Sequence, residues 1–228
     1  MIEFLFLDLD DTILDFHRAE QTAITKTLSL SGVEPTDETV ALYSRINRRH
    51  WAMLERGEIT RQQLQVMRFE ALFRELGVDA AARICAQNYA KLLGIGHYFL
   101  PGAEEAVKEL SRKYRLFLAS NGTASVQAGR LTSADLYPFF EQTFISEEIG
   151  FNKPSPGFFS RCFDRIPGFD PQKAMMVGDS LTSDILGGKN AGLLTCWVNP
   201  KHTPAREEIR PDYEIEYLHQ LPALLETI

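Results

Sequence analysis

Three carboxylates follow a short apolar segment near the amino terminus of this sequence. Asp8, Asp10 and Asp11 lie within four residues of one another, directly after Phe4-Leu5-Phe6-Leu7. Carboxylates this close repel each other, and burial at the end of a core strand makes each charge more costly. Some other group must compensate for this charge, and the identity of that group is the first clue to the chemistry.

Other polar groups follow apolar segments later in the chain. Ser120-Asn121-Gly122 and Asp179-Ser180 each end such a segment, and Lys153 lies in the loop GFNKPSP. Ligands of open α/β sheets bind beside the carboxyl ends of the strands, so these groups are expected at one edge. Each has an ordinary explanation when taken alone, because serines cap helices and loop lysines are usually solvated. Their convergence favours a functional site.

Carboxylates from distant segments form an all-oxygen site that suits Mg²⁺. Asp8 and Asp10 are two residues apart, which keeps their side chains on the same side of an extended chain, and Asp179 joins them from another strand. Asp11 then points elsewhere and is expected to be structural. A metal-bound carboxylate that faces a hydroxyl, an amide and a lysine is suited to a phosphoryl group, whose charge Lys153 and the metal would offset.

Alternating strands and helices must position these groups. The segments 2–9, 115–120, 142–146, 173–179 and 193–199 have the composition of buried strands, and helical patterns precede the later ones. Ser155-Pro156 and Asp170-Pro171 are typical helix starts. This alternation predicts an α/β fold with a Rossmann-like parallel sheet in a three-layer α/β/α core.

Residues 16–96 interrupt the alternation with four helical segments and no strand. Gly77 and Gly94 stand where two of these helices are expected to end. The sequence therefore predicts an inserted, all-helical cap domain at 16–96, and a catalytic core formed by 1–15 and 97–228.

Composition disfavours several classes of partner. The 228 residues carry a net charge of −7, which argues against a nucleic-acid polymer or an acidic membrane. No segment approaches the about 18 apolar residues of a membrane span, and the apolar start contains Glu3 without the basic leader of a signal peptide. Cys85, Cys162 and Cys196 are odd in number and widely spaced, which favours buried free thiols and a cytoplasmic location.

The four motifs together resemble those of the haloacid dehalogenase (HAD) superfamily of aspartyl-phosphate hydrolases. DLDDT at 8–12 is similar to the first motif of that family, DxDxT. Ser120 in LASNG, Lys153 in NKPSP and VGDSLTSD at 177–184 are similar to the second, third and fourth. The helical insertion also follows the first motif, as in one large subgroup. The resemblance covers essentially the whole chain, and four motifs in order are far more specific than any one alone.

The resemblance implies a catalytic role for the matching positions. Asp8 would be the nucleophile that forms an aspartyl-phosphate. Asp10 would protonate the leaving alkoxide and then activate water for the second step. Ser120 and Lys153 would bind the phosphoryl oxygens, with assistance from Asn121 and the neighbouring backbone amides.

The resemblance also implies a Mg²⁺ site. Its ligands would be Asp8, the backbone carbonyl of Asp10 and Asp179. Asp184 would hold a water molecule bound to the metal, although a solvated helix residue is the alternative interpretation for this position. Thr12 would brace the loop without touching the substrate.

The acid at position 10 favours a phosphatase within the superfamily. Dehalogenases cleave a carbon–halogen bond and typically lack an acid there, whereas phosphomutases of the β-phosphoglucomutase type share the motif and differ in the cap. A non-catalytic phosphate-responsive module is a further alternative, but the helical insertion and Asp10 argue against it. A scaffold that has lost activity is disfavoured because every expected catalytic position is filled.

The segment 46–69 resembles the cap of bacterial nucleotidases that hydrolyse pyrimidine nucleoside 5′-monophosphates. Trp51, GEITR at 57–61 and Arg68-Phe69 carry this likeness, together with VGDSLTSDILGG in the core. A sugar phosphate or another small metabolite is the alternative substrate, and a monomer or homodimer is expected. An aromatic ring and a guanidinium could stack on a base and bind its carbonyls. The candidates for this role are Phe16, Arg45, Arg49, Trp51 and Arg61, although Trp51 also fits the cap core and Arg49 a solvated surface.

Overall fold

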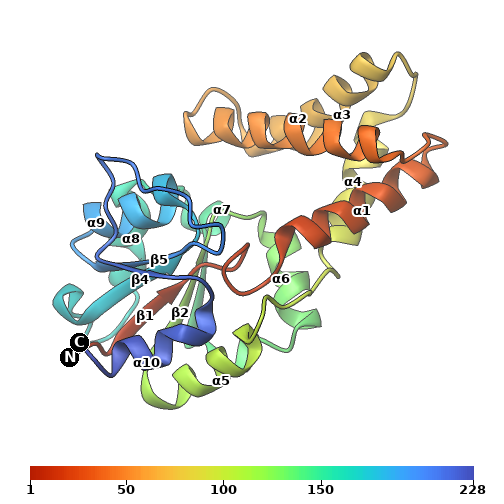
Figure 1. Cartoon of the computed structure of the whole chain (residues 1–228). Coiled ribbons are helices and arrows are strands. Elements are labelled where there is room, and N and C mark those ends of the chain that lie inside the picture. Colours follow the sequence, from red (N-terminus) through yellow and green to blue (C-terminus); the bar gives the residue numbers. More distant parts are fainter. The chain divides into compact units, whose positions relative to one another are not determined.

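A six-stranded sheet organises one part of the chain. The computed structural model describes residues 1–228, and its strands are arranged in the order β3-β2-β1-β4-β5-β6, all parallel (Figure 1). The strands are β1 (Phe4–Leu7), β2 (Arg115–Ser120), β3 (Gln142–Ile145), β4 (Ala174–Gly178), β5 (Leu194–Val198) and β6 (Tyr213–Ile215). The chain winds outward from β1 to β3 and then returns to β4, so the strand order reverses between β1 and β4. This switch point is where such sheets bind ligands.

The strands form because their apolar side chains are covered on both faces. All four residues of β1 are buried, and Phe6 stacks on Phe117 of β2 with ring centroids 5.3 Å apart. Helices α8 and α9 cover one face of the sheet, and α5 and α10 cover the other (Figure 1). The predicted three-layer α/β/α core is therefore confirmed. The helices are α1 (Phe16–Leu30), α2 (Asp37–Glu55), α3 (Arg61–Leu76), α4 (Ala82–Leu93), α5 (Ala103–Lys113), α6 (Ala124–Ser133), α7 (Ser146–Ile149), α8 (Pro156–Phe163), α9 (Leu186–Asn190) and α10 (Leu221–Leu225).

The chain divides into two compact units. The sheet unit comprises Met1–Phe16, His97–Ala124 and Ala134–Ile228, and the helical unit comprises His17–Gly96 and Ser125–Ser133. The boundaries expected from the sequence placed 125–133 in the core, whereas the structure groups α6 with the helical unit. The physical reason is close packing, because a side chain at Gly129 would overlap the Gly94 carbonyl, and Arg130 Nε donates to the Gly96 carbonyl at 2.9 Å.

The helical unit contains a buried polar network. Glu20 accepts hydrogen bonds from Ser44 Oγ at 2.7 Å and from Asn47 Nδ2 at 2.6 Å. Asn47 Oδ1 in turn accepts from Arg68 Nη1 at 2.9 Å, and the guanidinium of Arg68 lies 4.6 Å from the centre of the Tyr89 ring. These contacts connect α1, α2, α3 and α4, so the network fixes how these four helices pack together.

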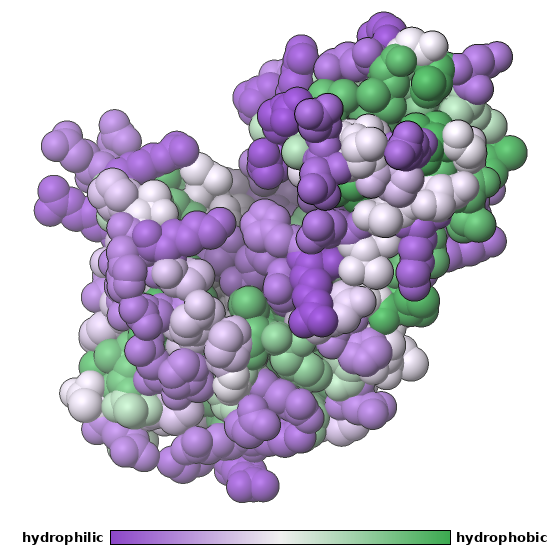
Figure 2. All heavy atoms as spheres, turned by 45° about the vertical axis from the view of Figure 1, so that its right-hand side comes forward, coloured by the Kyte–Doolittle hydropathy of each residue, from purple (hydrophilic) through white to green (hydrophobic).

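Part of the apolar surface remains exposed. Leu30, Val78, Ile84 and Ile95 of the helical unit are exposed, and Figure 2 shows hydrophobic residues, in green, among hydrophilic ones at the upper right. Exposed apolar side chains are common in folded proteins. No helix of the structure has both the length and the apolar character that crossing a membrane requires.

The sixth strand is missing from the sequence-based prediction. Its residues, Tyr213–Ile215, lie in the acidic stretch PDYEIEY, which lacks the continuous apolar character of the other strands. Asp212 fixes this edge strand by accepting hydrogen bonds from the backbone N–H and the hydroxyl of Thr195, at 2.9 and 2.7 Å. A short, charged edge strand also resists unwanted pairing with other chains. The three cysteines are buried and free, as predicted.

Candidate active site

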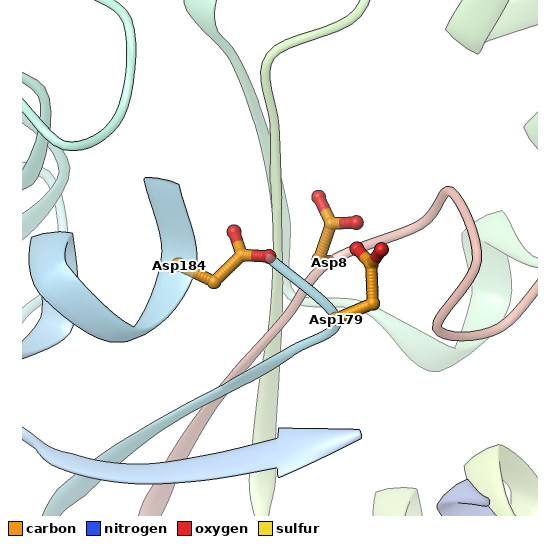
Figure 3. A group of neighbouring side chains, drawn as sticks. All are labelled: Asp8, Asp179 and Asp184. Atoms are coloured by element: carbon orange, nitrogen blue, oxygen red, sulfur yellow. The ribbon is translucent and has the colours of Figure 1, made fainter. Parts of the chain in front are cut away.

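Three carboxylates meet at the switch point of the sheet. Asp8 directly follows β1, Asp179 directly follows β4, and Asp184 lies in the π-helical turn η3 (Leu181–Ile185). One oxygen of each carboxylate lies within 4.8 Å of the others, and Figure 3 shows the three side chains gathered at this edge. The neighbouring positions of β1 and β4 bring Asp8 and Asp179 together, as the sequence predicts.

Lys153 lies buried between two of these carboxylates. Its ammonium donates to Asp8 Oδ1 at 2.7 Å, to Asp184 Oδ1 at 2.6 Å and to the Ala119 carbonyl at 2.5 Å. The side chain is 1% exposed. The three acceptors match the three protons of the ammonium, so each proton has a protein partner. Three carboxylates and one ammonium leave an excess of negative charge at this edge.

The electrostatics of the cluster favour a further cation. Burial raises the pKa of Asp8 to about 8 against the opposing effect of Lys153, and Asp184 and Asp10 add to the rise. Burial and the charge of Asp184 likewise raise the pKa of Asp179 well above its ordinary value. Burial alone would lower the pKa of Lys153, but Asp184 and Asp8 raise it above its usual range. An added divalent cation would lower the pKa of Asp8 and of Asp179 and so favour their ionised forms at neutral pH.

The structure places Asp184 in the three-carboxylate cluster with Asp8 and Asp179. The contact with a metal through water, which the resemblance implies for Asp184, stays a prediction. The turn folds Asp184 back over the end of β4, and Asp184 Oδ2 accepts from the Ser180 N–H at 3.0 Å. Gly178 permits this approach, because a Cβ there would overlap the Asp184 carboxylate. The sequence analysis did not recognise that Gly178 matters for the site. Its position directly before Asp179 is the only feature of the sequence that points to this role.

The side chain of Asp10 is not part of the three-carboxylate cluster. The role expected of its backbone carbonyl as a metal ligand stays a prediction. Asp11 is structural, as expected, because its Oδ1 accepts from the Phe16 N–H at the start of α1, at 2.9 Å. Asp11 also adopts a φ of 57°, which aspartate tolerates better than most residues. Thr12 is fully buried and its hydroxyl has no hydrogen-bond partner, and its role in bracing the loop stays a prediction.

Ser120 ends β2 beside the same cluster, and Asn121 directly follows the strand. The Ser120 hydroxyl is buried and accepts from the Gly122 N–H at 3.1 Å. The Asn121 amide bonds to the main chain of Lys153 at both ends: Nδ2 donates to the carbonyl at 2.9 Å, and Oδ1 accepts from the N–H at 2.8 Å. These contacts join the Asn121 side chain to the loop that carries Lys153, and its assistance in phosphoryl binding stays a prediction.

The proposed base-binding residues lie on three different helices, α1, α2 and α3. Phe16 begins α1 and belongs to the sheet unit. Arg45 and Arg49 are exposed on α2. The guanidinium of Arg61 lies 5.4 Å from the centre of the Trp51 ring, and Trp51 packs in a small apolar cluster with Leu54, Ile59 and Leu64. The role of all five residues toward a substrate stays a prediction.

Comparisons with known proteins agree with this site. The chain is 39% identical to HAD-hydrolase YfnB of Bacillus subtilis over 97% of this chain and 94% of that protein. It is 39% identical to pyrimidine 5′-nucleotidase PynA of Streptococcus pneumoniae, covering 93% of this chain and 90% of the relative. It is 32% identical to pyrimidine 5′-nucleotidase YjjG of Escherichia coli, with 98% and 97% covered.

Structural similarity points the same way. A crystal structure of YfnB described as bound to magnesium matches with a TM-score of 0.93 at 39% identity, and 98% of each chain is covered. The family model of haloacid dehalogenase-like hydrolases matches residues 2–192, which include all four motifs and the helical insertion. This chain therefore belongs to the haloacid dehalogenase-like hydrolase family.

Proposed function

We propose that this protein is a Mg²⁺-dependent phosphatase that hydrolyses pyrimidine nucleoside 5′-monophosphates through an aspartyl-phosphate. The observation that carries the proposal is the convergence of Asp8, Asp179 and Asp184 around the buried ammonium of Lys153. The nucleotidase relatives PynA and YjjG support the substrate class. The buried free thiols support a reducing, cytoplasmic location.

The residues present fit Mg²⁺. The three side chains offer only carboxylate oxygens, which this ion prefers, and their charge exceeds that of the single ammonium beside them. Asp8, Asp179 and Asp184 would hold the ion, together with the backbone carbonyl of Asp10. When bound, Mg²⁺ would offset negative charge on the phosphoryl oxygens.

The chain's own groups supply the covalent and proton-transfer steps. The Asp8 carboxylate, oriented by its 2.7 Å hydrogen bond from Lys153, attacks phosphorus in line with the leaving oxygen. One P–O bond forms to Asp8 as the bond to the nucleoside breaks, and Asp10 gives a proton to the departing oxygen. Asp10 then takes a proton from the water that attacks the phosphoaspartate, which releases inorganic phosphate and restores Asp8. Ser120 would bind the phosphoryl oxygens during both steps, and the positive charge of Lys153, whose protons go to Asp8, Asp184 and the Ala119 carbonyl, would offset their negative charge.

A phosphate-release screen tests the proposal. Purified protein with Mg²⁺ is incubated with UMP, dUMP, dTMP and a panel of sugar phosphates, and inorganic phosphate is measured. We expect the pyrimidine nucleotides to be preferred, and a preference for sugar phosphates would refute the substrate class. Asp8→Asn should abolish release, whereas Asp170→Asn, which changes a helix cap outside the carboxylate cluster, should retain it. Activity in Asp8→Asn would refute the mechanism.

A further inference from the structure

The amide of Asn121 holds both main-chain polar groups of one residue, Lys153. Asn121 Nδ2 donates to the Lys153 carbonyl at 2.9 Å, while the Lys153 N–H donates to Asn121 Oδ1 at 2.8 Å. Such a two-point contact fixes the orientation of a peptide segment as well as its distance, because both bonds must align together. Asn121 lies one residue beyond β2, so a rigid strand holds the loop.

The end of β2 also holds the other end of the Lys153 side chain. The ammonium donates to the carbonyl of Ala119, two residues before Asn121. Lys153 is therefore fixed at its backbone and at its Nζ by the same strand end. The same ammonium must reach Asp8 Oδ1 and Asp184 Oδ1, which come from two other segments.

Fixing the backbone matters because a lysine side chain is long and flexible. Ordering it costs conformational entropy, and its hydrogen bonds tolerate only a few tenths of an ångström. A shift of the loop would pull the ammonium away from at least one carboxylate. A misplacement of about 1 Å at a reacting group can reduce the rate about 100-fold.

We propose that Asn121 is a positioning residue, which acts by holding Lys153 against Asp8 and Asp184 instead of binding the phosphoryl group itself. This inference rests on the proposed phosphatase function for the role of Lys153. An amide suits this role, since its side chain has both the donor and the acceptor that the carbonyl and the N–H of one residue require.

A double-mutant cycle on kcat and KM tests the proposal. The variants are Asn121→Ala, Lys153→Met and the double variant, assayed with Mg²⁺ and the best substrate of the screen. If Asn121 acts through Lys153, Asn121→Ala alone lowers kcat/KM by about 10- to 100-fold. The double variant is then within about twofold of Lys153→Met. If Lys153→Met acts mainly on kcat, Asn121→Ala should also act mainly on kcat, and if Lys153→Met acts mainly on KM, so should Asn121→Ala. Independent losses that multiply in the double variant would overturn the proposal and indicate direct phosphoryl binding.

Asn199 provides a matched control. Its amide also binds both main-chain groups of one residue, Thr203, with Nδ2 donating at 2.9 Å and Oδ1 accepting at 3.1 Å. It directly follows β5 and shares no hydrogen-bond partner with Lys153. Asn199→Ala removes a comparable contact, and its effect should add to that of Lys153→Met within about twofold. If Asn199→Ala and Asn121→Ala showed equal coupling energies to Lys153→Met, the coupling would reflect the loss of any such loop contact. That result would overturn the proposal.

Two further measurements do not need enzymatic activity. Hydrogen exchange at the Lys153 amide should become faster in Asn121→Ala, and unchanged exchange would overturn the proposal. If Asn121→Ala does not fold by circular dichroism, Asn121→Ser replaces it in all assays.

If the wild-type protein releases no phosphate from any substrate, the phosphatase proposal fails. The double-mutant cycle is then repeated on the affinity for inorganic phosphate, measured by calorimetry. Coupling there supports the positioning role independently, and additivity rejects it.

Discussion

The carboxylate of Asp184 occupies the space beside the Cα of Gly178 where any other residue would place its Cβ. From that position Asp184 accepts from the Ser180 N–H at 3.0 Å and from Lys153 Nζ at 2.6 Å. The absence of a side chain at the end of β4 therefore sets the position of a carboxylate in the next turn of the chain.

Gly178→Ala should displace Asp184 and separate it from Lys153. We expect kcat/KM to fall by about 100-fold because the site loses its geometry. We also expect the free energy of unfolding to fall by about 1–3 kcal/mol through overpacking. Urea denaturation measures the second effect. In an Asp184→Gly background the overlapping atoms are gone, so the same substitution should cost little stability. An equal cost in both backgrounds would contradict the steric explanation.

Mg²⁺ should stabilise the native protein, because it relieves repulsion among Asp8, Asp179 and Asp184. A ligand that binds only the folded state at 100 times its Kd adds about 2.7 kcal/mol, which is visible as a rise in Tm. EDTA should reverse the rise, and Asp179→Asn should reduce it strongly. Asp170→Asn should keep the full rise, since Asp170 caps the 3₁₀ turn η2 (Pro171–Lys173) before β4 begins. A Tm that does not respond to Mg²⁺ would contradict the metal assignment.

Arg68→Met should destabilise the helical unit. The substitution removes the donor to Asn47 Oδ1 and the cation of the buried network that contains Glu20. Breaking a buried charged network by removing one partner typically costs about 3–5 kcal/mol. Arg48→Met, on the exposed side of α2, should change stability by no more than about 0.5 kcal/mol. Circular dichroism during urea unfolding compares the two, and similar stabilities would show that the network contributes little.

Asp212 should make the stability of the sheet edge depend on pH. Burial alone would raise the pKa of Asp212, but hydrogen bonds from Thr195 and Lys189 lower it below its ordinary value. The folded state thus favours the ionised form, so this stabilisation is present above the ordinary aspartate pKa of about 3.9 and is lost as pH falls through the folded value.

Asp212→Asn should therefore lower the free energy of unfolding at pH 7, by about 0.5–1 kcal/mol for a pair this exposed. The difference from wild type should shrink near pH 3, as measured by urea denaturation at both values. A difference that grows on acidification would reverse the predicted sign.

The sheet and the central acids of the site could be predicted because they depend on local composition and on strand geometry. A strand buried on both faces needs a continuous apolar run, which β1 shows clearly. Parallel strands end at one edge, so Asp8 and Asp179 had to converge once β1 and β4 were recognised.

The remaining features depend on how chain segments turn after the strands end. The π-helical turn that aims Asp184 at Lys153 has no marker in composition. The target of the Asn121 amide is a main-chain segment 32 positions away. The membership of α6 in the helical unit depends on the missing side chain of Gly129. Such relations are set by tertiary packing, which residue types alone do not reveal.

The central place of β1 has a consequence for how the protein is made. β1 is synthesised before both strands that flank it, since Phe4 pairs with Arg115 and with Ala174. The whole helical insertion is made before either of these neighbouring strands exists. During that interval the apolar strand lacks its neighbours, and unpaired apolar strands are prone to associate with other chains. Asp8, the proposed nucleophile, is thus synthesised well before the strand that carries Asp179 beside it.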